Sequence, residues 1–516
     1  MTTLSTQLLV VGGGATGLGV GWDASLRGLS VVVAEQGDLG EGTSGRYHGL
    51  LHSGGRYVLS DPESARACAA ENLILRRIAP HTIEDTGGLF IHTAHDPPHF
   101  PDDWLAACRA ASVPVDECSS TAARAAEPLL TPNISRAFRV HDAALDSFEL
   151  LHGLHAAIQK AGGRVLLRHR LERLVVRDGG FLAALATSAG EVVHIEAQIV
   201  VNAAGPHAGR VAAMAGVALP LALGKGAMVA MATRLVNTVI NRCKPPSDGD
   251  IIVPVGTVAV LGTTDTPTTS PDDVLVQAWE VDRLVDEAAI LLPGIASHRA
   301  LRAWAGIRPL HRPPHATHTE TRDLPRGHAL IDHGHEAGPP GFITIIGGKL
   351  TTFRLMAEET VDRACAILGH SAVCRTAHTL IEPSQPSHHR LPRRLERLTR
   401  ATARIGIVCE CELVTADDLD RALESDPTHD LDDLRRDLRL GMGPCQASFC
   451  AYRAAAVVAS LANGNGPPPI SGMRSFLEER WRGLRPLMFG GGLRQLELTR
   501  RVYQDLLAVD EAADGQ

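Results

Sequence analysis

A glycine-rich turn between two apolar segments near the start of the chain restricts the possible folds more than any other feature. Residues 8–11 form a short apolar segment that runs directly into Gly12-Gly13-Gly14-Ala15-Thr16-Gly17. A helical pattern continues from there to about Arg27, and a second apolar segment follows at 29–34. Strand, glycine turn, helix and strand make a βαβ unit. The chain is therefore expected to begin as an α/β fold with a parallel sheet.

The spacing of the three glycines indicates what this unit binds. Gly12, Gly14 and Gly17 permit a tight turn and let a pyrophosphate approach the N-terminus of the helix, whose free N–H groups favour an anion. Glu35 ends the second strand, where an acidic residue is expected to bind ribose. The pattern predicts a dinucleotide site but does not separate FAD from NAD.

Two later segments repeat the junction of an apolar strand with glycine. Residues 199–201 run into Asn202-Ala203-Ala204-Gly205, and 342–346 run into Gly347-Gly348-Lys349. We therefore expect one Rossmann-type domain built from separated segments, with an α+β substrate domain inserted between them. The expected ranges within 1–380 are about 1–87, 146–219 and 306–380 for the dinucleotide part and about 88–145 and 220–305 for the substrate part.

The C-terminal quarter has a different composition. Residues 381–400 begin with a stretch rich in Pro, Ser and His and are expected to be a linker. A small, mostly helical cysteine domain is expected over 401–463, followed by a helical tail over 464–516. A length of 516 residues with 44% hydrophobic residues is enough for several packed domains.

Four cysteines gather in the cysteine domain. Cys409 and Cys411 form one pair, and Cys445 and Cys450 form the other. Four thiolates can hold a soft metal or an iron–sulfur cofactor, and beside a dinucleotide site a redox role is favoured. Structural zinc and uncoordinated thiols remain alternatives.

Charge and hydropathy exclude several classes of protein. A formal net charge of -8 gives no basic footprint for nucleic acid. Residues 1–5 lack a basic region before the first apolar segment, so we expect no signal peptide and a cytoplasmic protein. No stretch offers about 20 uninterrupted apolar residues, so we expect membrane attachment only through partners.

The segment 42–57, which includes Thr43 and Ser44, narrows the cofactor to one. It resembles the flavin-contacting loop of the D-amino-acid-oxidase superfamily, whose small residues pass beneath the isoalloxazine. The resemblance implies FAD.

Further segments resemble one family within that superfamily. Residues 241–248, 262–265, 306–310 and 347–354, with the tail 476–481, are similar to the FAD-dependent glycerol-3-phosphate dehydrogenases, and closest to the large catalytic subunit of the anaerobic type. The resemblance covers nearly the whole chain. It implies oxidation of glycerol 3-phosphate to dihydroxyacetone phosphate.

The resemblance also implies roles for individual residues. The FAD-binding residues would be Gly12, Gly14, Gly17, Glu35, Thr43, Ser44, Gly205, Gly347, Gly348, Lys349, Leu350 and Thr351. The substrate-binding residues would be Arg56, Tyr57, Arg308, Arg322 and Lys349. Several cationic donors suit a phosphate dianion better than a carboxylate.

The chemistry requires a base and a means of stabilising negative charge. His48 and His52 lie in the flavin loop and are candidates to take the hydroxyl proton, because the pKa of histidine suits proton removal near neutrality. Arg308 could stabilise the developing alkoxide. The identity of the base stays open.

The cysteines resemble a small ferredoxin-like domain that binds a [2Fe-2S] cluster in bacterioferritin-associated ferredoxins. With Cys409, Cys411, Cys445 and Cys450 as ligands, electrons would pass through the cluster to the B and C subunits of a complex and then to quinone, with the chain peripheral on the cytoplasmic face of the inner membrane. Two alternatives remain: an amino-acid or 2-hydroxy-acid oxidoreductase of the same superfamily, and a non-catalytic iron–sulfur scaffold.

Overall fold

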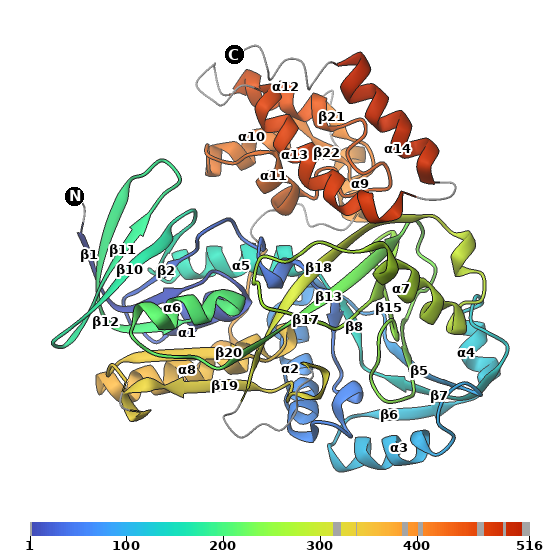
Figure 1. Ribbon diagram of the computed structural model, residues 1–516, viewed down its shortest axis with the longest axis horizontal. Helices are drawn as coiled ribbons and strands as arrows, with labels where there is room; N and C mark the ends of the chain where they lie inside the picture. Colours follow the sequence, from blue (N-terminus) through green and yellow to red (C-terminus); the bar gives the residue numbers. More distant parts are fainter. Residues whose placement is uncertain are drawn as a thin grey trace.

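The computed structural model describes residues 3–312, 321–336, 338–383, 391–400, 406–461, 469–488 and 492–507. Figure 1 shows two β-sheets side by side, with a cluster of helices from the C-terminal quarter above them. In the described part of the chain, no helix is both long enough and apolar enough to cross a membrane.

The first sheet carries the glycine turn. Its order is β10-β11-β12-β1-β2-β9, with β20 paired to β12 and β19 paired to β20. β1 pairs in parallel with β2 and β12, and β12 pairs in parallel with β20. The three junctions of strand and glycine therefore lie together in one sheet, as predicted. The strands are β1 (Thr3–Val11), β2 (Val31–Ala34), β9 (Arg164–Leu166), β10 (Arg170–Arg177), β11 (Gly180–Ala186), β12 (Val192–Asn202), β19 (His328–Asp332) and β20 (Phe342–Gly347).

Both faces of this sheet are buried. Alternate residues of a strand point to opposite faces, so Leu8 and Val10 join one core while Leu9 and Val11 join another. The first core includes residues of α1 (Ala15–Leu26), α5 (Ser147–Lys160) and α8 (Phe353–Leu368). The second includes residues of β10, β11 and α6 (Ala208–Met214). Burial on both faces explains the continuous apolar runs in the sequence.

The second sheet has nine strands in the order β17-β13-β16-β15-β14-β5-β7-β6, with β18 paired to β13. Its strands are β5 (Gly88–Thr93), β6 (Val115–Cys118), β7 (Ile134–Val140), β13 (Leu221–Met231), β14 (Val239–Arg242), β15 (Ile251–Val255), β16 (Val258–Gly262), β17 (Thr266–Thr268) and β18 (Ala300–His311). The helix α7 (Ala278–Leu291) packs in its core. The expected boundary at residue 306 falls inside β18, so Arg308 belongs to this sheet.

The remaining elements of the first 380 residues are short strands and helices. β3 (Leu50–Leu51), β4 (Ile83–Glu84) and β8 (Ala143–Leu145) form a third, small sheet. The helices are α2 (Pro62–Ile78), α3 (Phe100–Ala110) and α4 (Ser120–Ala126).

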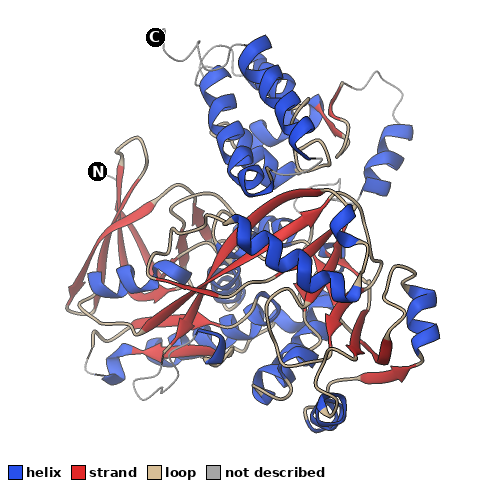
Figure 2. Cartoon of the chain, turned by 45° about the vertical axis from the view of Figure 1, so that its right-hand side comes forward, coloured by secondary structure: helices blue, strands red, loops and turns tan. Residues whose placement is uncertain are grey.

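The C-terminal quarter is a separate helical unit with its own core (Figure 2). Its elements are α9 (Leu391–Arg400), β21 (Ile407–Cys409), β22 (Val414–Thr415), α10 (Ala416–Ser425), α11 (Leu431–Leu438), α12 (Ala451–Leu461), α13 (Pro469–Leu484) and α14 (Gly492–Arg501). The capping box of Thr415 and Asp418 starts α10, and α12 follows Cys450 directly.

Part of the expected linker is a helix. Residues 391–400 form α9, and two arginines hold this helix against the helical unit. Arg394 is buried and donates to the Glu412 carbonyl, and Arg397 binds Asp418 at 2.6 Å. Residues 384–390 of that linker, and 462–468, 489–491 and 508–516 around the tail, lie outside the described residues.

Ion pairs join this helical unit to the dinucleotide domain. The Arg436 guanidinium lies 2.8 Å from the Asp38 carboxylate, with both side chains buried. Arg168 binds Asp426 at 3.2 Å. On the side of the second sheet, Arg299 donates to the Pro444 carbonyl at 2.8 Å. The helical unit is therefore anchored to both sheets.

Candidate active site

The glycine turn has the geometry that a dinucleotide requires. Gly12 has φ +111°, and a Cβ there would lie 2.5 Å from the Ala203 carbonyl oxygen. Gly14 is the residue before α1 and has no side chain with which to cap the first N–H groups of the helix. The Glu35 carboxylate accepts from the N–H groups of Gly13 at 2.6 Å and Gly37 at 2.9 Å. These residues fit a pyrophosphate and a ribose.

The flavin loop is fixed between the two sheets. Ser44 Oγ accepts from the Ala15 N–H of α1 at 2.9 Å. Thr43 Oγ1 donates to the Ile307 carbonyl of β18 at 2.8 Å. The loop therefore ties the glycine turn of the first sheet to the strand that carries Arg308.

A cavity of about 1180 Å³ opens beside this loop. Predicted site residues from both sheets line it: Thr43, Ser44, His48, His52, Arg56, Tyr57, Gly205, Arg308, Arg322, Gly347, Gly348, Lys349 and Leu350. Thr351 is fully buried behind the wall, where its hydroxyl accepts from the His52 N–H at 3.1 Å. Gly12, Gly14, Gly17 and Glu35 are not among the residues that line the cavity. Ala203, which does line it, lies against Gly12 and Gly17. The volume suits a large cofactor together with a small substrate.

Two of the predicted cations are held by buried aspartates. Arg56 Nη1 lies 2.8 Å from Asp250 Oδ1, with the aspartate fully buried. Arg308 Nη1 lies 3.1 Å from Asp265 Oδ1, and its Nη2 donates to the Thr264 carbonyl at 3.0 Å. These contacts fix the direction of both guanidinium groups.

Space for Arg308 comes from a glycine on the neighbouring strand. A Cβ at Gly226 would lie 2.3 Å from Arg308 Nη2. Gly226 belongs to β13 and pairs with Gly306 of β18. Neither glycine has a positive φ, so the requirement is for room and not for an unusual backbone.

Arg326 also belongs to this group, although no sequence motif marks it. Its Nη2 lies 3.1 Å from Asp265 Oδ2, so one aspartate orients both Arg308 and Arg326. Its carbonyl accepts from Lys349 Nζ at 2.9 Å. The sequence Pro325-Arg326-Gly327 is typical of an ordinary turn. The only signal that could have found Arg326 is the resemblance of 262–265 to the family, since that segment contains the aspartate that holds it.

Lys349 and Arg322 complete the set of cations. Lys349 Nζ lies 4.2 Å from the centre of the Tyr57 ring, and burial lowers the pKa of this lysine. Arg322 forms an ion pair with Asp248 and is partly exposed. All five side chains of this set therefore line the cavity, and the four arginines among them form ion pairs with aspartates.

Both candidate bases are uncharged in this environment. Burial, with repulsion from Arg56 and Arg308, lowers the pKa of His48 to about 3. Burial, with repulsion from His48 and Lys349, lowers the pKa of His52 well below its usual value. His48 Nδ1 accepts from the Leu50 N–H at 3.2 Å, so neutral His48 carries its hydrogen on Nε2.

The four cysteines lie together within the helical unit. The thiol of Cys450 contacts those of Cys409 and Cys445, and Cys445 contacts Cys411. Backbone N–H groups of Gly441 and Glu412 point at the Cys409 sulfur, and those of Ala447 and Phe449 point at Cys445. Such donors stabilise thiolates and suit an anionic cluster.

The backbone of the loop that carries Cys445 is strained. Gln446 has φ +51° and Ala447 has φ +73°, two successive non-glycine residues in the left-handed region. This turn brings the Ala447 N–H to the Cys445 sulfur. Residues held in this way are concentrated at functional sites.

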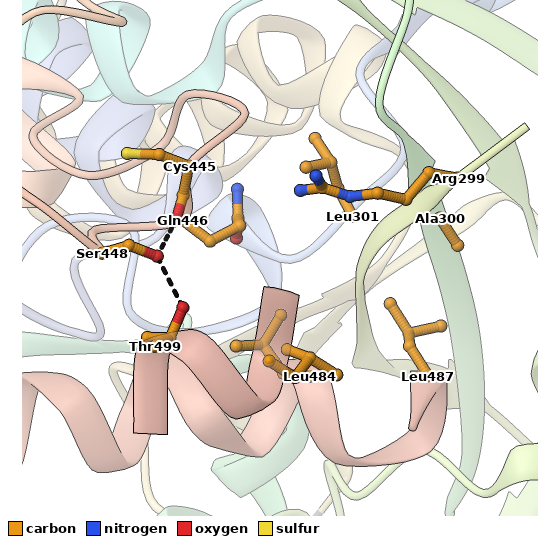
Figure 3. Close-up of a pocket in the computed structure, with 10 residues that line it drawn as sticks. Arg299, Ala300, Leu301, Cys445, Gln446, Ser448, Leu484, Leu487 and Thr499 are labelled. Carbon is orange, nitrogen blue, oxygen red and sulfur yellow. Dashed lines mark hydrogen bonds between the residues drawn. The ribbon is translucent and has the colours of Figure 1, made fainter. Parts of the chain in front are cut away.

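The described residues, which include the four cysteines, show no arrangement of three or more His, Cys, Asp or Glu side chains that could hold a metal ion. A cavity of only about 20 Å³ lies beside Cys445, lined by Gln446, Ser448, Arg299 and Thr499 (Figure 3). It has room for about one water molecule.

The glycine turn, the flavin loop and the cationic cavity together define an FAD-dependent oxidoreductase. In agreement, residues 7–354 match the family described as FAD dependent oxidoreductase, whose short name is DAO. The crystal structure of the glycerol-3-phosphate dehydrogenase from Bacillus halodurans with FAD has the same fold, with a TM-score of 0.65 and 22% identity over 94% of this chain and 96% of that chain.

Two curated relatives match nearly end to end. The A1 subunit of the anaerobic glycerol-3-phosphate dehydrogenase of Haloferax volcanii is 37% identical, over 99% of this chain and 92% of its own length. The A subunit of the anaerobic glycerol-3-phosphate dehydrogenase of Escherichia coli K12 is 38% identical, over 98% of both chains. The chain belongs to the family of anaerobic glycerol-3-phosphate dehydrogenase A subunits.

Proposed function

We propose that this chain oxidises sn-glycerol 3-phosphate to dihydroxyacetone phosphate, with FAD as the hydride acceptor. The observation that carries the proposal is the group of cationic side chains around one cavity, beside a glycine turn that fits a dinucleotide. The names of the relatives agree with this substrate. The residues that would hold FAD are the 12–17 turn, Glu35, the loop at Thr43 and Ser44, Gly205 and the 347–351 junction.

The arginines would bind the phosphate and orient the rest of the substrate. A phosphate dianion accepts paired N–H groups, and Arg308 and Arg326 present theirs from a shared aspartate. Arg56, Arg322 and Lys349 add charge around the same volume. Holding the carbon that bears the C2 hydroxyl in one place can contribute about 7 kcal/mol. A pocket for a carboxylate would need fewer cations.

The C2 hydroxyl must lose a proton as its hydride leaves, and bound FAD supplies the acceptor for that hydride. We propose His52 as the base that accepts the proton of the C2 hydroxyl. His48 uses Nδ1 to accept from the backbone and presents a hydrogen-bearing Nε2, which makes it a donor to the substrate oxygen. His52 is neutral and lines the cavity beside Tyr57, with ring centres 5.3 Å apart. Arg308 would stabilise the charge that develops on the oxygen.

Electrons would leave through the cysteine quartet. Cys409, Cys411, Cys445 and Cys450 would hold a [2Fe-2S] cluster, supported by the backbone N–H groups that point at their sulfurs. The cluster would pass electrons to the B and C subunits and then to quinone. The chain itself would work in the cytoplasm, peripheral to the inner membrane through those partners.

A reductive titration tests the substrate. Purified protein loaded with FAD is mixed anaerobically with glycerol 3-phosphate, a D-amino acid or 2-hydroxyglutarate, and the flavin absorbance is followed. Bleaching with glycerol 3-phosphate alone is expected. Bleaching only with the amino acid or hydroxy acid would replace the proposed substrate, and no bleaching at all would favour a non-catalytic scaffold.

Metal analysis tests the electron route. Anaerobically purified protein is assayed for iron, acid-labile sulfide and zinc. Iron and sulfide in equal amounts are expected. Zinc without sulfide would exclude the cluster and leave the dehydrogenase reaction untouched.

A further inference from the structure

The helix α13 lies between the two proposed redox sites. A Cβ at Gly483 would lie 2.9 Å from the Ala303 carbonyl oxygen, so α13 packs directly on β18. Glu479 is 3.8 Å from Arg46, a residue of the cavity wall. Figure 1 shows α13 next to β18. Arg480, the residue after Glu479, donates a hydrogen bond to the loop that carries Cys445.

Arg480 holds this loop in place. Its Nη2 donates to the Gly441 carbonyl at 2.9 Å and to Gln446 Oε1 at 2.5 Å. The Gln446 side chain in turn donates to the Gly443 carbonyl at 2.9 Å. These bonds fix three points of the loop from a single guanidinium.

The charge of Arg480 is poorly compensated within the protein. The side chain is only 2% exposed, and Nε and Nη1 have no hydrogen-bond partner among the described residues. Arg302 and Arg435 repel it. Asp432 attracts it, but that carboxylate already binds Arg435 at 2.6 Å and also binds Arg436. A buried guanidinium with so few partners destabilises the folded protein unless an anion lies nearby.

The cysteine quartet can supply that anion. Gln446, which accepts from the Arg480 guanidinium at 2.5 Å, is the neighbour of Cys445 in the chain. Four thiolates around a [2Fe-2S] centre carry a net negative charge, and reduction adds one electron more. We propose that Arg480 is the buried counter-cation of this centre, which favours its assembly and its reduced state. The inference rests on the proposed [2Fe-2S] site.

The reduction potential of the cluster gives the first test. Arg480→Met and the charge-retaining Arg480→Lys are compared with wild type by EPR-monitored titration. Arg480→Met should disfavour the reduced cluster about tenfold, which is about 59 mV more negative for one electron, and Arg480→Lys should recover most of the shift. Arg482→Gln is the matched control, because this neighbour on α13 is exposed and pairs with Glu479.

Thermal unfolding with and without the cluster gives a second readout that does not depend on activity. Loading the cluster should raise the midpoint less in Arg480→Met than in wild type or Arg482→Gln. An equal rise in all three, with an unchanged potential, would overturn the counter-cation role. Wild-type protein without iron and sulfide would instead overturn the proposed cluster, so the two failures are distinguishable.

Discussion

Alanine at Gly226 should impair substrate oxidation by moving Arg308. The added Cβ would lie 2.3 Å from Nη2 and 2.7 Å from Cζ, whereas ordinary contacts begin near 3.4 Å. The guanidinium must therefore retreat by about 1 Å, away from the Thr264 carbonyl and Asp265 that orient it. A displacement of that size costs about 100-fold in rate, or about 2.7 kcal/mol of transition-state stabilisation.

The assay is anaerobic stopped-flow reduction of the flavin by glycerol 3-phosphate, with FAD content measured in parallel. Gly294→Ala is the control, because a Cβ there meets nothing within 4 Å and the backbone has no positive φ. FAD content should be unchanged in both variants. Combining Gly226→Ala with Arg308→Met should add little to Arg308→Met alone, since both act on one guanidinium. A Gly226→Ala protein with wild-type kcat/KM would refute the reasoning.

Three further outcomes are expected. Arg326→Gln should raise KM for glycerol 3-phosphate by about tenfold or more, because it removes a charged donor that shares Asp265 with Arg308. Steady-state kinetics measures this KM, and an unchanged value would contradict the prediction. His52→Gln should slow flavin reduction by about 100-fold or more and His48→Gln should slow it less; equal losses would contradict the assignment of the base. Because burial lowers the pKa of His52, its neutral form persists in mild acid, and the rate should show no inflection near pH 6.5, the ordinary value for histidine.

The sequence alone determined the local architecture. The glycine turn at 12–17 occurs where the pattern predicts it, and nearby residue types also account for the capping box at Thr415 and the start of α12 after Cys450. Each depends on contacts between residues that are close in the chain, so the residue types are sufficient. The three repeated junctions of an apolar strand with glycine indicated one dinucleotide domain, and their strands do lie in one sheet.

Only the tertiary structure decided how the charged groups act. Arg326 and Arg308 share Asp265 across separations of 61 and 43 residues, a relation that no local pattern carries. The sequence predicts that Arg394 lies in a linker, whereas in the structure it is buried against Glu412 in a packed helix. The lowered pKa values of the two histidines and the poorly compensated charge of Arg480 arise from burial and from distant neighbours. Desolvation and Coulomb interactions depend on position in space, which the order of residues fixes only through the complete fold.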